Sequence, residues 1–90
     1  MSSKEIWKYQ LAVTDDQTLR LPYGAQILSV QVQNGIPCIW ALVDTDDDRL
    51  THRRFQIVGT GNPADHVGES RFIGTFQLHG GILVFHLFEA

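Results

Sequence analysis

Apolar and polar residues alternate with a period of two along most of the chain, and clusters of turn-forming residues separate the alternating runs. In residues 6–13, for example, Trp7, Tyr9, Leu11 and Val13 would share one face of an extended segment. This period is typical of β-strands with one buried face, and no segment has the spacing of an amphipathic helix. The pattern predicts strands over residues 6–13, 18–21, 26–33, 36–43, 51–58, 71–78 and 82–88.

Two short turns indicate that neighbouring strands pair as antiparallel hairpins. Asn34-Gly35 joins two strands, and both residue types tolerate the positive φ of a two-residue hairpin turn. His79-Gly80-Gly81 predicts a second hairpin. Residues 59–69 form the longest stretch without strand character, and we expect one short helical turn within residues 60–70. The sequence therefore predicts a single all-β domain over residues 1–90, a small antiparallel sandwich or barrel-like sheet of six to seven strands.

Two of the predicted strands, residues 36–43 and 82–88, are apolar on both faces. A sheet in a small domain normally exposes one face to water, so these strands need cover from a second sheet or from a second copy of the chain. The C-terminal strand, which ends at Ala90, is expected to add edge-on to a partner. This pattern predicts a homo-oligomer, most simply a two-fold dimer. The interface residues expected on the C-terminal strand are Ile82, Val84, Phe85 and His86.

Composition restricts the partners and the compartment. The hydrophobic fraction of 43% and the charged fraction of 19% are those of a chain that folds. The net charge is −3 and the basic residues are scattered, so we expect no nucleic acid polymer as a partner. Cys38 is the only cysteine, so an internal disulfide is excluded, and no run of about 18 apolar residues could cross a membrane. These features predict a soluble protein of the cytoplasm.

The best local candidate for a ligand site is the loop that follows the strand over residues 51–58. Successive backbone N–H groups in a glycine-rich turn can form a concave anion site, to which threonine and asparagine side chains add donors. The loop lacks the lysine of a phosphate-binding P-loop, and ordinary loop geometry explains the same composition. The candidate ligand-binding residues are Gly59, Thr60, Gly61, Asn62 and His66.

Other clusters that could carry chemistry are incomplete. The four histidines lack short ligand spacings, and the acidic run over residues 44–48 lacks the glycine and glutamate of an EF-hand, so it reads as a charged hairpin tip. Cys38 lies in an apolar strand, where a buried, inert thiol is expected. His86 lies between two apolar residues and is expected to be hydrogen-bonded and partly buried. We therefore predict no metal, no cofactor and no enzymatic activity.

Five stretches of the sequence carry a resemblance to a known group of proteins. They are Trp7-Lys-Tyr9, residues 24–44, Gly59-Thr-Gly-Asn-Pro63, Ile73-Gly-Thr-Phe-Gln77 and Val84-Phe-His-Leu-Phe-Glu89. Together they resemble a family of small uncharacterised proteins encoded by bacteriophages and prophages. The resemblance covers nearly the whole chain, carries no transferable activity and implies action in the cytoplasm of an infected bacterium.

Three functions agree with this resemblance. The first is a phage-encoded accessory protein that acts by binding and interferes with a host or defence protein. The second is a homo-oligomeric protein that binds and sequesters a small nucleotide, with residues 59–62 in its pocket. The third is a minor structural or assembly component of the virion.

Overall fold

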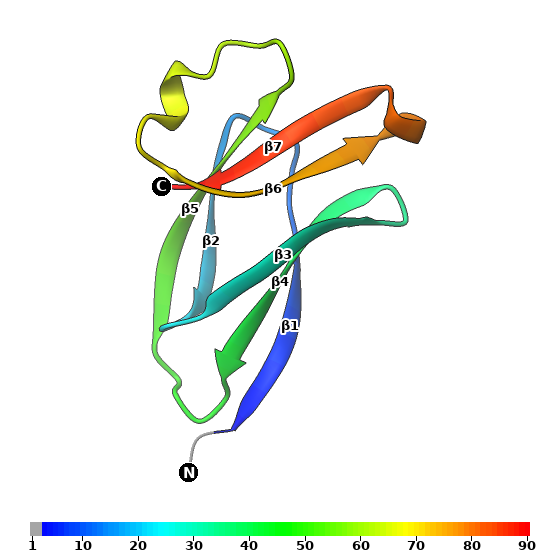
Figure 1. The fold of residues 1–90 in the computed structure, drawn as a ribbon. Helices are drawn as coiled ribbons and strands as arrows, with labels where there is room; N and C mark the ends of the chain where they lie inside the picture. Colours follow the sequence, from blue (N-terminus) through cyan, green and yellow to red (C-terminus); the bar gives the residue numbers. More distant parts are fainter. Residues whose placement is uncertain (1–2) are drawn as a thin grey trace.

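The computed structural model describes residues 3–90, which form seven β-strands and two short 3-10 turns (Figure 1). The alternating residues form strands because extended backbone places successive side chains on opposite faces, so one face can be buried. The strands are β1 (Lys4–Gln10), β2 (Asp16–Pro22), β3 (Gln26–Gln33), β4 (Ile36–Asp44), β5 (Leu50–Gly59), β6 (Arg71–Leu78) and β7 (Leu83–Glu89), and the 3-10 turns are η1 (Asp65–Val67) and η2 (His79–Gly81).

The strands form two sheets in which every pairing is antiparallel. Sheet A has the order β1-β4-β3 and sheet B has the order β2-β5-β7-β6. The two sheets are not joined by backbone hydrogen bonds between β3 and β6, so the fold is an open, barrel-like sandwich. The predicted all-β class, the antiparallel pairing and the upper limit of the predicted strand number are confirmed. The turn predicted within residues 60–70 is η1.

Both predicted hairpin turns are present. Asn34 and Gly35 have φ values of 53° and 79°, which are the left-handed values that a two-residue hairpin turn needs. His79 and Gly80 also have positive φ, 53° and 67°, and lie within η2. Within residues 3–90, no helix is long and apolar enough to cross a membrane.

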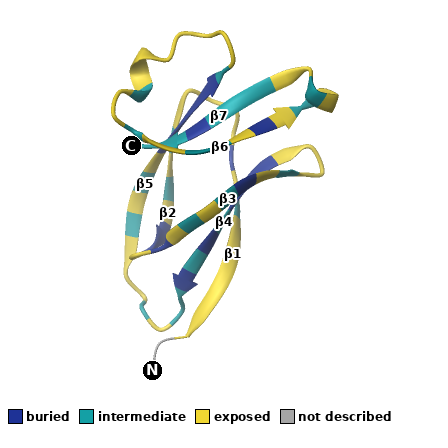
Figure 2. Ribbon diagram, viewed as in Figure 1, coloured by how far each residue is buried: buried dark blue, intermediate teal, exposed yellow. Residues whose placement is uncertain are grey.

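The hydrophobic core lies between the inward faces of the two sheets (Figure 2). On β4, Ile39, Ala41 and Val43 alternate into this core, and Phe55 enters from β5 as the largest of the fully buried side chains. The other buried members are Leu11, Leu21, Ala25, Val30, Ile57, Phe76 and Leu87.

The first strand differs from its predicted bounds. β1 ends at Gln10, three residues before the predicted end, because Gln17 bonds both backbone groups of Ala12 and draws the chain away from the sheet. Leu11 still bonds Pro37 through its N–H and is buried. Trp7 and Val13 were predicted to share the buried face, and this was wrong for both. Trp7 is 40% exposed within β1, and Val13 lies outside the strand and is 45% exposed.

Candidate functional site

The apolar character of both faces of β4 has a direct structural consequence. Ile39, Ala41 and Val43 face the core, so the alternate residues Trp40 and Leu42 face outward from sheet A. The outward side chains of Trp40 and Leu42 are only half-buried, because no further element formed by residues 3–90 packs on this face. The second apolar face that the sequence indicated is therefore partly exposed to solvent.

The outer face of sheet A carries several apolar side chains. The cross-strand register places Ile6 opposite Leu42, and Trp40 lies in the next row between Lys8 and Ser29. Ile6 is 59% exposed. We call Ile6, Leu28, Trp40 and Leu42 the sheet A patch; Leu28, 44% exposed, is the extra residue of the β3 bulge.

A polar pair crosses β4 beside the sheet A patch, near Cys38. Lys8 Nζ donates a 2.6 Å hydrogen bond to Gln33 Oε1, which links β1 to β3 across β4. Cys38 lies in β4 between the rows of these two residues, and its side chain is buried even though it faces outward. The expectation of a buried cysteine is confirmed.

The glycine-rich loop begins at Gly59, the last residue of β5. Thr60 N donates to Val84 O at 2.9 Å and Asn62 N donates to Gly59 O at 3.0 Å. Two of the N–H groups that were expected to form an anion site therefore already have partners. The loop also lines a hollow of about 470 Å³ together with the start of β7.

His66 is brought close to this loop. His66 belongs to η1. It lines a hollow of about 310 Å³ together with Asn62, Gly59, Asp15 and others. Four of the five predicted ligand residues, all except Gly61, line one or both of these hollows.

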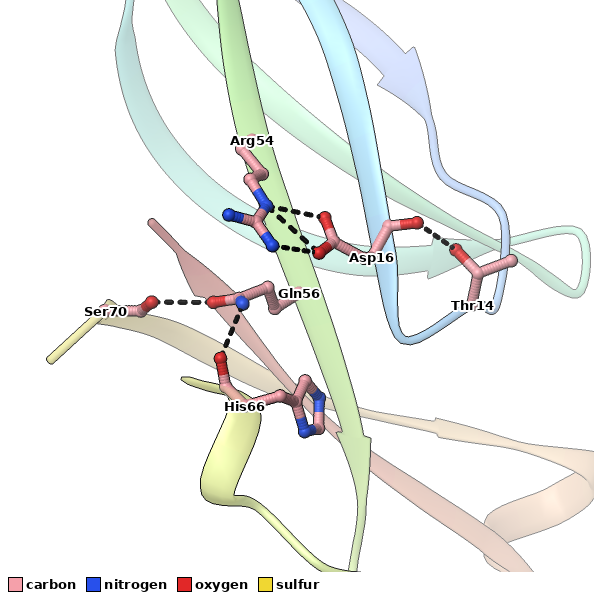
Figure 3. A network of polar contacts seen from close by, with 6 residues as sticks. All are labelled: Thr14, Asp16, Arg54, Gln56, His66 and Ser70. Atoms are coloured by element: carbon pink, nitrogen blue, oxygen red, sulfur yellow. Dashed lines mark hydrogen bonds and ion pairs between the residues drawn. The ribbon is translucent and has the colours of Figure 1, made fainter. Parts of the chain in front are cut away.

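A buried glutamine holds the loop over residues 60–70 against the outer face of sheet B (Figure 3). Gln56 Nε2 donates to the carbonyl oxygen of His66 at 2.7 Å, and Ser70 Oγ donates to Gln56 Oε1 at 2.6 Å. Beside it, Arg54 forms a bidentate ion pair with Asp16, which lowers the pKa of that carboxyl group. The loop is thus fastened by specific contacts.

His86 joins two threonines that are far apart in the sequence. Its Nδ1 lies 2.9 Å from Thr75 Oγ1 and its Nε2 lies 2.7 Å from Thr60 Oγ1. A neutral imidazole has one donor and one acceptor nitrogen, so one hydroxyl donates and the other accepts. The expectation of a hydrogen-bonded, partly buried histidine is confirmed. The Thr60 and Thr75 partners have no signal in the sequence, since neither lies at a short spacing from His86.

The expected interface residues lie in different environments. Ile82 precedes β7 and is 83% exposed, whereas Val84, Phe85 and His86 are half-buried within the strand. The prediction that the C-terminal strand lies at a sheet edge was wrong, because β7 pairs with β5 on one side and β6 on the other. Edge-on addition of a partner to β7 is therefore excluded.

The acidic run over residues 44–48 was predicted to be a charged hairpin tip, and this was wrong, because the run links β4 of sheet A to β5 of sheet B and these two strands do not pair. Arg49 donates to Asp47 through Nε and Nη2, the shortest distance being 2.7 Å, and these bonds lower the pKa of Asp47 to about 2. Arg49 also lies over the ring of Tyr23, 4.1 Å from its centroid. Among residues 3–90, no three histidine, cysteine, aspartate or glutamate side chains gather in a way that could hold a metal ion.

Comparison with known proteins identifies one family. The family model described as a domain of unknown function (DUF7352) matches residues 2–90. Neither a curated protein nor a solved structure matches the chain.

Proposed function

We propose that this chain, which belongs to the DUF7352 family, acts by binding another protein through the outer face of sheet A. In this proposal it is a phage-encoded accessory protein of the host cytoplasm that interferes with a host or defence protein. The observation that carries the binding role is the sheet A patch: Trp40 and Leu42 are only half-buried, and Ile6 and Leu28 are largely exposed.

The composition of this face favours a protein partner. Protein interfaces combine an apolar, aromatic centre with a polar rim, and tryptophan is enriched among the residues that contribute most to affinity. Trp40 is central in sheet A, and the rim includes Lys4, Lys8 and Gln26. Asp44 lies opposite Lys4 on the same face, so the complementary surface has an apolar centre and a carboxylate that faces Lys8.

Replacing Leu42 by aspartate tests this function, because a carboxylate in the centre of the patch would be desolvated on binding. We expect affinity capture from bacterial lysate to recover a stoichiometric partner with the unmodified chain, and Leu42→Asp to weaken its binding at least about 100-fold. Titration calorimetry with the purified partner measures the change.

The matched control is Phe72→Asp, which places the same charge on the outer face of sheet B, where Phe72 is 55% exposed. The control should bind as the unmodified chain does. Equal binding by both variants, or no partner in any capture, would refute the proposed function. Circular dichroism and urea unfolding confirm that each variant is folded.

We further propose that two copies associate through β1. Within residues 3–90 this strand pairs only with β4, and six of its seven residues are exposed. Antiparallel pairing of two β1 strands about a two-fold axis at Trp7 places Ile6 opposite the partner's Lys8 and separates like charges. It places the two sheet A patches on the same face of one extended sheet, which leaves them available to the protein partner.

A proline in β1 tests the dimer. Leu11 N donates to Pro37 O, so in the antiparallel ladder the odd residues of β1 bond β4 and the N–H of Lys8 points away from the sheet. Lys8→Pro removes an N–H that only a second copy would use, whereas Lys8→Ala keeps it. Sedimentation equilibrium should give twice the monomer mass of 10.2 kDa for Lys8→Ala and the monomer mass for Lys8→Pro. A monomeric unmodified chain contradicts this proposal.

A further inference from the structure

The two sheets meet along a seam between β3 and β6. Each of these strands is at the edge of its own sheet, and the two edges lie side by side. Residues 30–32 of β3 lie beside residues 75–77 of β6, and the segments that follow, 32–35 and 77–80, also share a hollow. The two strands therefore run in the same direction, as Figure 1 also shows.

The seam is closed at one end and open at the other. A Cβ added to Gly74 would lie 2.8 Å from Val30 Cγ1, so the two strands touch at this point. Each strand has a bulge just before the contact, between Ile27 and Ser29 in β3 and between Phe72 and Gly74 in β6. Beyond this contact, toward the hairpin turns, hollows of about 300 and 250 Å³ lie along the two edges.

The backbone groups of β3 that face the seam follow from the hairpin geometry. A two-residue turn makes Gln33 and Ile36 a hydrogen-bonded pair, and such pairs alternate along an antiparallel ladder. Val30 and Val32 are therefore the residues whose N–H and C=O groups point into the seam. Pro37, the residue opposite Val32, has no N–H, which agrees with this assignment.

The seam-facing groups of β6 follow in the same way from the hydrogen bonds of β7. Thr60 N donates to Val84 O and Ala90 N donates to Arg54 O. The even-numbered residues of β7, and Ala90 after it, therefore form the hydrogen bonds to β5. The odd-numbered residues then bond β6. Thr75 and Gln77 lie opposite even-numbered residues of β7, which bond β5 and not β6. The backbone N–H and C=O groups of Thr75 and Gln77 therefore point away from β7 and into the seam.

We propose that the open half of the seam binds one extended peptide segment of another protein. The segment lies antiparallel to both strands, so that it forms an antiparallel ladder with Val30 and Val32 on one side and with Thr75 and Gln77 on the other. Insertion of a strand here joins sheet A to sheet B. This site is separate from the sheet A patch and does not depend on the function proposed for it.

The side chains beside the seam define the chemistry of the segment. Val30 and Phe76 are buried, and Val32 packs against the core, so inward positions take apolar residues. Thr75 and Gln77 are exposed, so outward positions take polar residues. Residues of the segment whose side chains point inward would bond β3, and residues whose side chains point outward would bond β6. An extended strand meets both conditions, because side-chain direction and backbone hydrogen-bond direction both alternate from one residue to the next. The open half accommodates a segment of about five residues. To admit it, the backbones of β3 and β6 must move apart to about twice the usual spacing between strands, about 9–10 Å.

Amide hydrogen exchange measured by NMR tests whether the seam is open in the free protein. The amides of Val30, Val32 and Gln77 should exchange at least about tenfold faster than those of Gln31 and Phe76, which bond within the sheets. Equal protection at all concentrations would show that β3 and β6 already bond to each other, and would overturn the proposal. Protection that is lost on dilution would assign the seam to a second copy of this chain, which also overturns it.

A tethered segment tests binding itself. The sequence Thr-Val-Thr-Val-Thr, fused after Ala90 through a Gly/Ser linker of about 16 residues, reaches the seam at millimolar effective concentration. The control fusion replaces both valines by proline, which cannot donate to the ladder. We expect the first fusion, and not the control, to slow exchange at least about tenfold at Val30, Val32, Thr75 and Gln77. Unchanged exchange in the valine fusion, or equal protection in both fusions, refutes the site.

Discussion

Truncating Phe55 to alanine is expected to lower the free energy of unfolding by about 3–5 kcal/mol. Phe55 is fully buried where β5 contributes to the core, and alanine would remove most of its apolar contacts and leave a cavity. A domain of this size has a total stability on the order of 5–13 kcal/mol. The change would therefore remove a large share of it, and urea unfolding followed by circular dichroism measures the loss.

Phe72→Ala is the control for this prediction. The rings of Phe72 and Phe88 meet edge to face with their centroids 5.5 Å apart, but Phe72 is 55% exposed. Its truncation should therefore lower the free energy of unfolding by no more than about 1 kcal/mol. The dependence of unfolding on urea concentration should stay unchanged in both variants. Similar losses for Phe55→Ala and Phe72→Ala would show that the assigned core is wrong.

Local signals account for the parts of the fold that could be predicted. Alternation identified the strands, and Asn34-Gly35 identified a hairpin because few residues adopt positive φ without strain. The order of strands within the sheets was not predictable in this way. β5 pairs with β2 and β7, which are distant in the sequence, and nothing in the composition of β7 indicates whether one or two neighbours bond it.

The candidate sites show the same limit. Gly59, Thr60 and Asn62 were recognised from composition, but Thr60 N and Asn62 N bond within the protein, and this follows only from the position of β7 and the loop turn. His86 meets Thr60 across 26 residues of sequence. The apolar outer face of β4 was predictable from its unbroken apolar run, since a strand with two apolar faces must direct one of them away from a single core.

The cluster around Glu89 had no signal in the sequence either. Arg53 donates to Glu89 through Nε and Nη2, the latter at 3.0 Å, and Arg71 donates to the same carboxylate at 3.3 Å. Arg53 Nη1 also donates to the carbonyl oxygen of Ala25 at 2.7 Å. The hydrogen bond from Arg53 to Glu89 raises the pKa of Arg53. This ion cluster ties β5, the first residue of β6 and the last residue of β7 to the residue before β3.

Replacing Glu89 by glutamine should lower the free energy of unfolding by about 2–3 kcal/mol. The side chains of Arg53 and Glu89 are only 20% and 10% exposed, so the substitution leaves the Arg53 guanidinium with poor access to water and without a counter-charge. Arg71→Gln is the matched control, because Arg71 is 67% exposed and its ion pair is well solvated, so its loss should be under about 1 kcal/mol.

Urea unfolding of the two variants and of the double variant Arg53→Met/Glu89→Gln measures the coupling. The double variant should be less destabilised than the sum of its single changes, since it removes the uncompensated charge. Additive losses, or equal losses for Glu89→Gln and Arg71→Gln, would contradict the assignment of Arg53 and Glu89 as a coupled pair.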